Sequence, residues 1–260
     1  GRFVSWSDVV ALEQFDTHRF RATAGDEWSS LQGVHGGYVA ALAVTASERV
    51  LTDEGVEPGT SMRAATFGYV SGNRLGELEL DVEIVRRGRA MITSHVRVAQ
   101  EGRTTTVARL HHSTPWDGPA YSDAPPRPER PVEPVRLDTS GRANHLANVD
   151  TLLHPNTTVF AGAGRSEWLA WCRPRHGSTI DASWLTMFGD YFPPSVFTRV
   201  TGPNRAVTIE YAIQIHGAAG SWTLADDEEL VARMHTFHSS DGFAVEDGWI
   251  WRAEGELLAT

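Results

Sequence analysis

The sequence predicts an α+β protein made of two similar halves, each with one long helix packed on an antiparallel sheet. Two observations support this prediction. Each half places a helical segment before a run of alternating strands, and a proline-rich segment divides the 260 residues near the middle. Either half is long enough to bury a core of its own.

The proline-rich segment marks the expected boundary between the halves. Seven of the 20 residues from Pro115 to Pro134 are proline. Proline fixes φ and removes a backbone donor, so such a segment is extended and forms neither helix nor sheet. We therefore expect one domain over residues 1–114, a linker over 115–136 and a second domain over 137–260.

The first half is expected to contain one buried helix and five strands. The stretch that begins at Tyr38 is Ala-rich and lacks Gly and Pro up to Gly55, so a helix of about four to five turns fits. It is apolar on nearly every side up to Thr45, which indicates burial. The predicted strands, separated by Gly-containing turns, are Thr17–Thr23, Met62–Val70, Glu77–Arg86, Ala90–Gln100 and Thr104–Ser113.

The second half repeats this order without repeating the residues. An extended region over Thr157–Cys172 comes before a helix over Asp181–Asp190. The strands expected after this helix are Ala206–His216, Glu229–His238, Gly242–Trp251 and a last strand that begins at Glu256. A tandem duplication is the simplest account of the repeated order.

Composition and charge argue against several classes of function. The formal charge is −10 and the sequence has no basic stripe, which disfavours nucleic-acid binding. No stretch approaches the roughly 18–20 apolar residues of a membrane span. Cys172 is the single cysteine, so no disulfide forms within the chain and a cytoplasmic location is expected.

Four histidines stand in two close pairs, a pattern that can indicate a metal site. His111 and His112 are neighbours on a predicted strand, so their side chains point to opposite faces. His235 and His238 also lie on different faces, and no third ligand stands at a fixed spacing from them. The sequence therefore predicts no metal site, and no other cofactor is expected.

Two stretches of the sequence carry a resemblance to a known family. A Gly-Gly pair, Gly36-Gly37 after His35, opens the buried Ala-rich helix of the first half. In the second half, Asp190 ends the helix, and a strand containing Thr208 follows. In these features the chain resembles the double hot-dog acyl-CoA thioesterases, the bacterial thioesterase II-like family, over nearly its whole length. The resemblance implies two tandem hot-dog domains, each a long helix wrapped by an antiparallel sheet, fused into one protein that hydrolyses acyl-CoA to free fatty acid and CoA.

The resemblance also implies roles for particular residues. In that family the second-half helix supplies a catalytic Asp and the next strand a catalytic Ser or Thr, and by motif position these roles fall on Asp190 and Thr208. Both would position the water that attacks the thioester. A Gln from the last strand normally completes the set, and it is expected a few residues after Thr260, where this sequence stops.

The neighbours of Asp190 give a separate reason to select it. Strongly apolar residues stand on both sides of it, and a buried carboxylate usually has partners or a task. Burial and a position near a helix C-terminus both raise its pKa, which makes it a better base for water. The alternative is an Asp that bonds the turn before Pro193. Thr208 by itself is an ordinary strand residue, selected only by its position after Asp190.

The segment His35-Gly36-Gly37-Tyr38 is predicted to bind substrate. Glycines at the start of a helix let backbone N–H groups approach a ligand, and a helix N-terminus favours an oxyanion or a phosphate. No carboxylate follows His35 in this helix until Glu48. We therefore interpret His35 as a packing or substrate-contact residue and place the catalytic base in the second half.

Two other functions stay open at this point. His216 and Gly220 match part of the His-x-x-x-Gly-x-x-x-x-Pro pattern of fused hot-dog dehydratases, but Ala225 stands where proline is needed. The second alternative is a non-catalytic acyl-CoA-binding protein. The acyl-chain length, a carrier protein as donor in place of CoA, and assembly into a homo-oligomer are also open.

Overall fold

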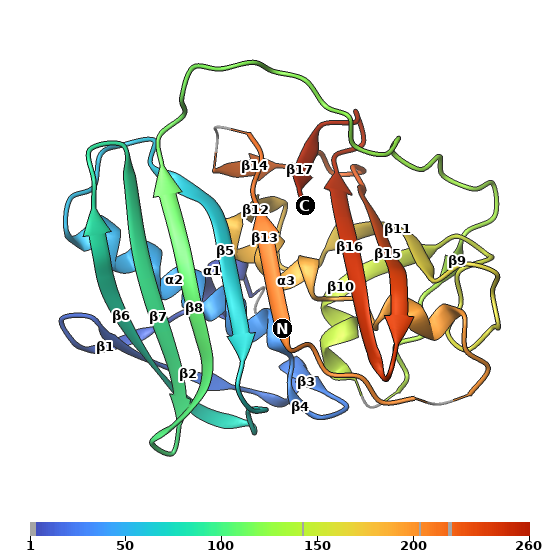
Figure 1. The fold of residues 1–260 in the computed structure, drawn as a ribbon, viewed down its shortest axis with the longest axis horizontal. Coiled ribbons are helices and arrows are strands. Elements are labelled where there is room, and N and C mark those ends of the chain that lie inside the picture. The colour runs from blue at the N-terminus through green and yellow to red at the C-terminus, as the bar shows by residue number, and fades with distance from the viewer. Residues whose placement is uncertain (1–3, 142, 203, 218–219) are drawn as a thin grey trace.

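Residues 4–141, 143–202, 204–217 and 220–260 are described by the computed structural model. Two large antiparallel sheets stand side by side, with one long helix and one short helix packed against them (Figure 1). The helices are α1 (Trp6–Val9), α2 (Gly36–Asp53) and α3 (Ala182–Gly189), with short 3-10 turns η1 (Asp26–Trp28), η2 (Asn144–Asn148) and η3 (Ser195–Thr198).

The sheets account for most of the strands. In spatial order the seven-stranded sheet contains β1 (Glu13–Asp16), β2 (Arg19–Ala24), β6 (Gly76–Arg87), β7 (Met91–Gln100), β8 (Arg103–Ser113), β5 (Ser61–Tyr69) and β13 (Glu210–Gln214). The six-stranded sheet contains β17 (Leu257–Ala259), β16 (Phe243–Trp251), β15 (Leu230–Ser240), β11 (Glu167–Pro174), β10 (Val149–Leu153) and β9 (Val135–Arg136). Two small hairpins pair β3 (Ser29–Ser30) with β4 (Gly33–Val34) and β12 (Thr179–Asp181) with β14 (Ser221–Thr223).

Strand β13 belongs to the second half of the chain but lies in the sheet of the first half. It pairs with β5 in antiparallel register, from Glu210 opposite Gly68 to Gln214 opposite Ala64. On its other side, Ile215 forms an isolated bridge with Ala259 at the end of the second sheet. The sequence patterns predicted the strand but gave no indication of its partner. As a result, the residues just before β13 lie next to the first half.

Helix α2 is the long buried helix that the sequence predicts. It begins at Gly36, two residues before the expected start, because the His35 side chain caps it by accepting a hydrogen bond from the Tyr38 N–H at 3.2 Å. Its residues from Val39 to Val44 are completely buried. The helix ends at Asp53, and Gly55 follows with φ +68, a conformation that favours glycine.

Helix α3 agrees with the prediction to within one residue at each end. Asp181 is its N-cap and accepts a hydrogen bond from the Trp184 N–H at 2.8 Å, and Asp190 is its C-cap. Every residue from Ala182 to Phe188 is buried. Burial on all sides fits a helix that lies between two sheets, with Trp184 and Phe188 stacked at 4.7 Å between ring centroids.

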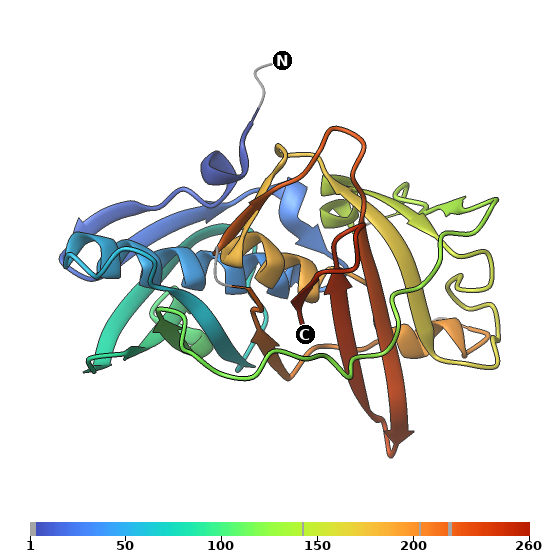
Figure 2. The same cartoon turned by 90° about the horizontal axis from the view of Figure 1, so that it is seen from above.

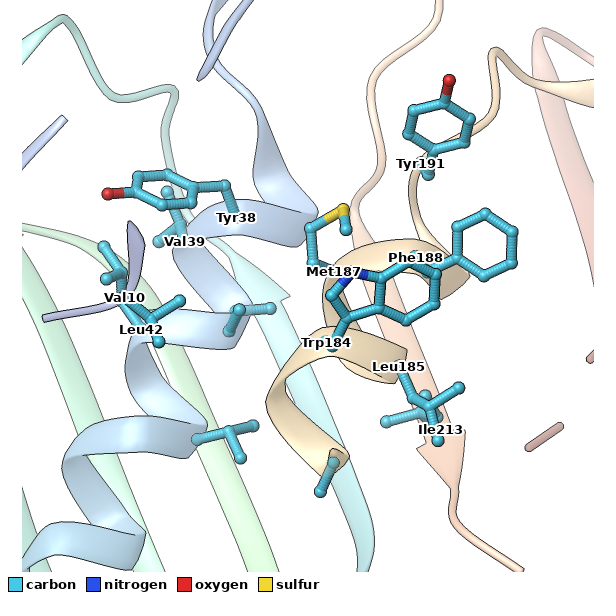
Figure 3. Packing of buried hydrophobic residues seen from close by; sticks show 14 of the residues in the cluster. Val10, Tyr38, Val39, Leu42, Trp184, Leu185, Met187, Phe188, Tyr191 and Ile213 are labelled. Carbon is cyan, nitrogen blue, oxygen red and sulfur yellow. The ribbon is translucent and has the colours of Figure 1, made fainter. Parts of the chain in front are cut away.

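Helices α2 and α3 pack against each other and join the cores of the two halves. The start of α2 meets the end of α3, and the absence of a side chain at Gly37 permits the contact: a Cβ there would lie 2.5 Å from the Met187 carbonyl oxygen. Figure 3 shows Met187 of α3 near the start of α2, and Leu185 on the other side of α3 beside Ile213 of β13. One hydrophobic cluster includes residues of both halves.

Some predicted segments differ from the structure. The extended region over Thr157–Cys172 becomes a strand only from Glu167, because turns at Phe160 and Gly162, both with positive φ, come before it. The strand predicted over Ala206–His216 is shorter and begins at Glu210. Strand β10 was missed, since five residues give too short an alternation to stand out.

The proline-rich segment has the predicted extended form. Residues 114–134 contain no helix or strand, and Figure 2 shows the chain crossing here from the first sheet to the second. Arg130 ties the segment to the second half by donating to Glu229 at 2.9 Å. In the described parts of the chain, no helix has the length and apolar character needed to cross a membrane.

Candidate active site

Asp190 lies where the two halves meet. It follows the last residue of α3, and the buried face of that helix fixes its position. Thr208 donates a hydrogen bond from Oγ1 to Asp190 Oδ1 at 3.0 Å. The backbone N–H of Gly37, from the other half, also bonds the Asp190 carboxyl group. The structure therefore brings together Asp190, Thr208 and the Gly36-Gly37 pair.

The two glycines leave room for the carboxyl group. A Cβ on Gly36 would lie 2.9 Å from Asp190 Oδ2, and one on Gly37 would lie 3.1 Å from Asp190 Cβ. Both separations are shorter than an ordinary van der Waals contact. A side chain at residue 36 would therefore collide with Oδ2.

The environment of Asp190 raises the pKa of its carboxyl group toward neutral pH. The pKa of its carboxyl group is raised from 3.8 to about 7, chiefly by burial and to a smaller extent by the charge of Glu246. The hydrogen bonds from Thr208 and Gly37 oppose this rise because they stabilise the carboxylate. Since a general base works best when its pKa lies close to the ambient pH, this carboxyl group suits proton abstraction from water.

Thr208 connects the site to the surface. It lies two residues before β13, so the observed strand leaves out this part of the strand predicted over Ala206–His216. Thr208 is exposed together with its apolar neighbours Val207 and Ile209. Because the backbone is irregular here, the Thr208 hydroxyl turns toward Asp190.

His35 is buried and both of its ring nitrogens are engaged. Nδ1 accepts the Tyr38 N–H at 3.2 Å, so Nε2 carries the proton and donates to the Asp190 carbonyl oxygen at 2.8 Å. Burial, followed by the nearby His145, lowers the pKa of His35 well below its ordinary value, which keeps the ring neutral. His35 therefore holds the backbone of Asp190 in place.

The sequence gave no signal for His145, which lies in the short turn η2. Its ring stacks on His35 with centroids 4.1 Å apart. Nδ1 lies 3.2 Å from the Ser29 carbonyl oxygen and Nε2 lies 3.2 Å from that of Tyr191. The two stacked rings thus contact the consecutive carbonyl groups of Asp190 and Tyr191, and they fix the chain at the end of α3.

Tyr38 contributes its backbone to the site but not its ring. The ring stacks on Trp28 with centroids 4.8 Å apart, and its hydroxyl donates to the Val9 carbonyl oxygen at 3.3 Å. Figure 3 shows the Tyr38 ring pointing away from α3. The predicted substrate-binding segment is therefore near Asp190 at Gly36 and Gly37, whereas the side chain of Tyr38 belongs to the core of the first half.

Three further residues surround Asp190 and were not selected from the sequence. Glu246 of β16 accepts a hydrogen bond from the Ser195 N–H at 2.7 Å and acts electrostatically on Asp190. Tyr69 of β5 and Tyr211 of β13 both have pKa values raised well above the ordinary range, first by burial and then by the charge of Asp190. Tyr69 and Glu246 come from strands far from α3 in sequence, whereas Tyr211 lies only three residues after Thr208. No local pattern indicates that these side chains meet Asp190.

Family models match almost the entire chain. The model of the acyl-CoA thioesterase N-terminal domain matches residues 24–113, and the model of the acyl-CoA thioesterase C-terminal domain matches residues 117–260. No curated protein matches the sequence.

Solved structures share the fold at low sequence identity. A conserved protein of unknown function with a hot-dog fold from Alicyclobacillus acidocaldarius is 19% identical with TM-score 0.84, over 97% of this chain and 94% of that chain. The acyl-CoA thioesterase II TesB2 of Mycobacterium marinum is 18% identical with TM-score 0.72, over 97% of this chain and 94% of that chain. The tesB protein of Mycobacterium avium subspecies paratuberculosis is 16% identical with TM-score 0.75, over 98% of this chain and 96% of that chain.

These matches agree with the arrangement of two helix-and-sheet halves predicted from the sequence. The fold is a tandem hot-dog, and both halves match thioesterase domains. The chain therefore belongs to the acyl-CoA thioesterase family and is a thioester hydrolase.

Proposed function

We propose that this protein hydrolyses an acyl-CoA to the free fatty acid and CoA by direct attack of a water molecule that Asp190 and Thr208 position. The observation that carries the proposal is the Asp190 carboxyl group, whose pKa burial raises to about 7 and whose Oδ1 accepts the Thr208 hydroxyl. A base of this strength removes a proton from water as the water attacks.

In this proposal Thr208 and Asp190 each offer one hydrogen-bond acceptor to the attacking water. The Thr208 hydroxyl donates its proton to Asp190 Oδ1, so its oxygen lone pairs are free to accept a hydrogen bond from water. Asp190 Oδ2 faces the space beside Gly36 and accepts the other water proton. Held by both groups, the water directs a lone pair at the thioester carbon.

The reaction then proceeds in two steps without a covalent enzyme intermediate. Water adds to the carbonyl carbon while Asp190 takes one of its protons, and the carbonyl π electrons move to the oxygen. The tetrahedral oxyanion collapses, the C–S bond breaks, and the CoA sulfur leaves with the proton that Asp190 returns. The products are the fatty acid and the thiol of CoA, and Asp190 is again a carboxylate.

The surroundings of Thr208 support an acyl chain as the group transferred. Val207 is 63% exposed and Ile209 is 54% exposed on either side of Thr208. Apolar side chains at the mouth of a site favour an apolar substrate. In this proposal the acyl chain contacts that edge while the thioester lies between Asp190 and Gly36.

Release of free CoA from a series of acyl-CoAs tests the proposal. The wild type should release CoA, and Asp190→Asn should lower kcat by about 100- to 10,000-fold, the usual contribution of a general base. T208V removes the hydroxyl at nearly constant shape and should lower kcat, whereas T208S keeps the hydroxyl and should retain most activity.

Two outcomes would count against the proposal. Tight acyl-CoA binding without any CoA release by the wild type would indicate a non-catalytic acyl-CoA-binding protein. A folded Asp190→Asn variant with unchanged kcat would show that another group activates the water.

A further inference from the structure

The hydroxyl group of Tyr69 is enclosed and has no hydrogen-bond partner. Part of the Tyr69 ring remains exposed, but its Oη atom is buried, and no described residue of the chain bonds it. A buried hydroxyl without a partner costs about 1–3 kcal/mol. Such a group in a native fold requires an explanation, and a bound ligand is one.

Tyr69 faces the same space as Asp190. From the position that a Gly36 Cβ would occupy, Asp190 Oδ2 lies 2.9 Å away and Tyr69 Cζ, the carbon that carries the hydroxyl, lies 3.2 Å away. A backbone hydrogen bond also brings Tyr69 close to Thr208. The Tyr69 N–H donates to the carbonyl oxygen of Ile209, the residue after Thr208, at 2.9 Å. Strand β5, which contains Tyr69, lies beside β13, which begins directly after Ile209 (Figure 1).

The hydroxyl of Tyr69 differs from that of the other tyrosine near Asp190, and a neighbouring threonine hydroxyl also has no partner among the described residues. Tyr211 also lies beside Asp190, but its hydroxyl donates to the Thr186 carbonyl oxygen at 3.0 Å. Thr106, directly opposite Tyr69 in the strand register, has a second buried hydroxyl with no partner among the described residues. The wall formed by β5 and β8 thus presents unpaired polar groups near the site.

Three backbone N–H groups near the start of α2 already have acceptors. Gly37 bonds the Asp190 carboxyl group, Tyr38 donates to His35 Nδ1, and Val39 donates to the His35 carbonyl oxygen at 3.2 Å. These donors are not free for a substrate oxygen. Hydrolysis of a thioester nevertheless needs a donor at the oxygen where negative charge develops.

We propose that Tyr69 is a catalytic residue of this site, whose hydroxyl donates a hydrogen bond to the thioester carbonyl oxygen and to the oxyanion formed when water attacks. The inference rests on the proposed thioesterase function and adds the group that stabilises its intermediate. The Tyr69 proton stays on the phenol throughout: the carbonyl oxygen gains an electron pair, and that pair re-forms the C=O bond when the C–S bond breaks.

The electrostatics of the site keep Tyr69 in the donor form. Burial raises the pKa of its phenol well above the ordinary value, and the charges of Asp190 and Tyr211 raise it further. The phenol therefore remains protonated across the pH range in which Asp190 works as a base. A neutral donor also leaves the charge of Asp190 unpaired, which keeps that carboxylate basic.

A pair of phenylalanine variants tests the proposal. Y69F keeps the ring and removes only the unpaired hydroxyl, so we expect kcat to fall roughly 100- to 1,000-fold, as for loss of one oxyanion donor, while Tm stays constant or rises. Y211F is the matched control: it removes a satisfied hydroxyl, so we expect Tm to fall and kcat to fall far less than in Y69F.

Binding of two unreactive analogues provides a second readout. A ketone analogue of acyl-CoA, with CH2 in place of sulfur, keeps the carbonyl oxygen, and a thioether analogue, S-alkyl-CoA, has none. Y69F should weaken binding of the ketone by about 3- to 10-fold, the value of one neutral hydrogen bond, and leave thioether binding unchanged.

The outcomes separate this proposal from the proposed function. A Y69F variant with kcat within about threefold of the wild type, far from the loss of an oxyanion donor, would overturn the role of Tyr69 while thioesterase activity stands. Equal changes in ketone and thioether binding would also overturn it. If the wild type hydrolyses no acyl-CoA, the proposed function fails, and the two analogues still test the contact of Tyr69 with a carbonyl oxygen.

Discussion

Asp190 owes its chemical character to partners from both halves of the chain. Its carboxyl group lies among buried apolar residues and accepts hydrogen bonds from Thr208 and Gly37, while Glu246 adds a second acidic group nearby. These effects oppose one another, and burial is the largest, so the pKa rises to about 7. A carboxylate held this way is less stable than one in water, and it is therefore a stronger base.

The raised pKa has a consequence for stability. The folded pKa of Asp190, about 7, lies above the ordinary value of 3.8, so the folded protein binds a proton more tightly than the unfolded chain does. The stability of the wild type should therefore fall as pH rises between these two values. In the Asp190→Asn variant the side chain at this position has no charge at any pH, so the variant does not lose this part of its stability as pH rises.

Thermal unfolding at two pH values measures this effect. The Tm of Asp190→Asn minus the Tm of the wild type should be larger at about pH 8 than at about pH 5. The comparison uses the same pair of proteins at each pH, so any constant effect of the substitution cancels. A difference in Tm that stays the same at both pH values would contradict the raised pKa.

At the level of single residues, the sequence indicated only some of the residues that lie at the candidate site. Asp190 stood out through its apolar neighbours, and Thr208 through its position after Asp190. Tyr69, His145 and Glu246 carry no local signal, because each meets Asp190 only through the tertiary fold. The roles assigned to Asp190, Thr208 and the His35-Gly36-Gly37-Tyr38 segment stay predictions until activity is measured.

At the level of secondary structure, the contact between α2 and α3 determines where Asp190 lies. The backbones approach closely at Gly37, where a methyl group would meet the Met187 carbonyl oxygen at 2.5 Å and His35 Cε1 at 2.7 Å. A backbone carbonyl in a buried helix cannot move aside easily. The glycine is therefore needed for helix packing as well as for the open space beside the carboxyl group.

Replacement of Gly37 by alanine should destabilise the protein. Alanine normally favours a helix over glycine by about 1 kcal/mol, but the overlap with Met187 should exceed this gain, since overpacking typically costs about 1–3 kcal/mol. We expect a lower Tm for G37A. The matched control is G118A in the proline-rich segment, where a Cβ meets nothing within 4 Å and Tm should not change. A Tm for G37A equal to or above that of the wild type would contradict the tight helix contact.

The helices were easier to predict than the strands at the site. Helix α3 has clear signals at both ends, Asp181 as N-cap and the prolines after Asp190, so its range is right to within one residue. The strand predicted over Ala206–His216 continues its alternation through Val207 and Ile209, yet pairing starts only at Glu210. The interaction of Thr208 with Asp190 replaces pairing there, and no alternation pattern encodes such a contact.

At the scale of the whole molecule, residues of both halves form the proposed active site. The first half contributes Gly36, Gly37 and Tyr69, and the second contributes Asp190 and Thr208. The repeated order of helix and strands predicted the two halves and their fold class, which the family models and the solved structures support. It did not predict that β13 crosses into the first sheet, which is what carries Thr208 to the junction.

In our proposal the active site requires both halves. Helix α3 supplies the base, but the space beside that base is bounded by α2 and β5 of the other half. The domain ranges 1–114 and 137–260, with the linker between them, stay a prediction. The catalytic unit in our account is the complete pair of hot-dog halves.

The pH dependence of kcat/KM tests the central claim most directly, because this quantity reports the pKa of the essential base in the free enzyme. With an acyl-CoA as substrate, the wild type should show a rate that rises with pH, with an apparent pKa near the value of about 7 for Asp190, and then a plateau. Asp190→Asn should lack this rise and be far slower at every pH. A flat profile for the wild type, or a rise of the same size and position in Asp190→Asn, would contradict the assignment of Asp190 as the base.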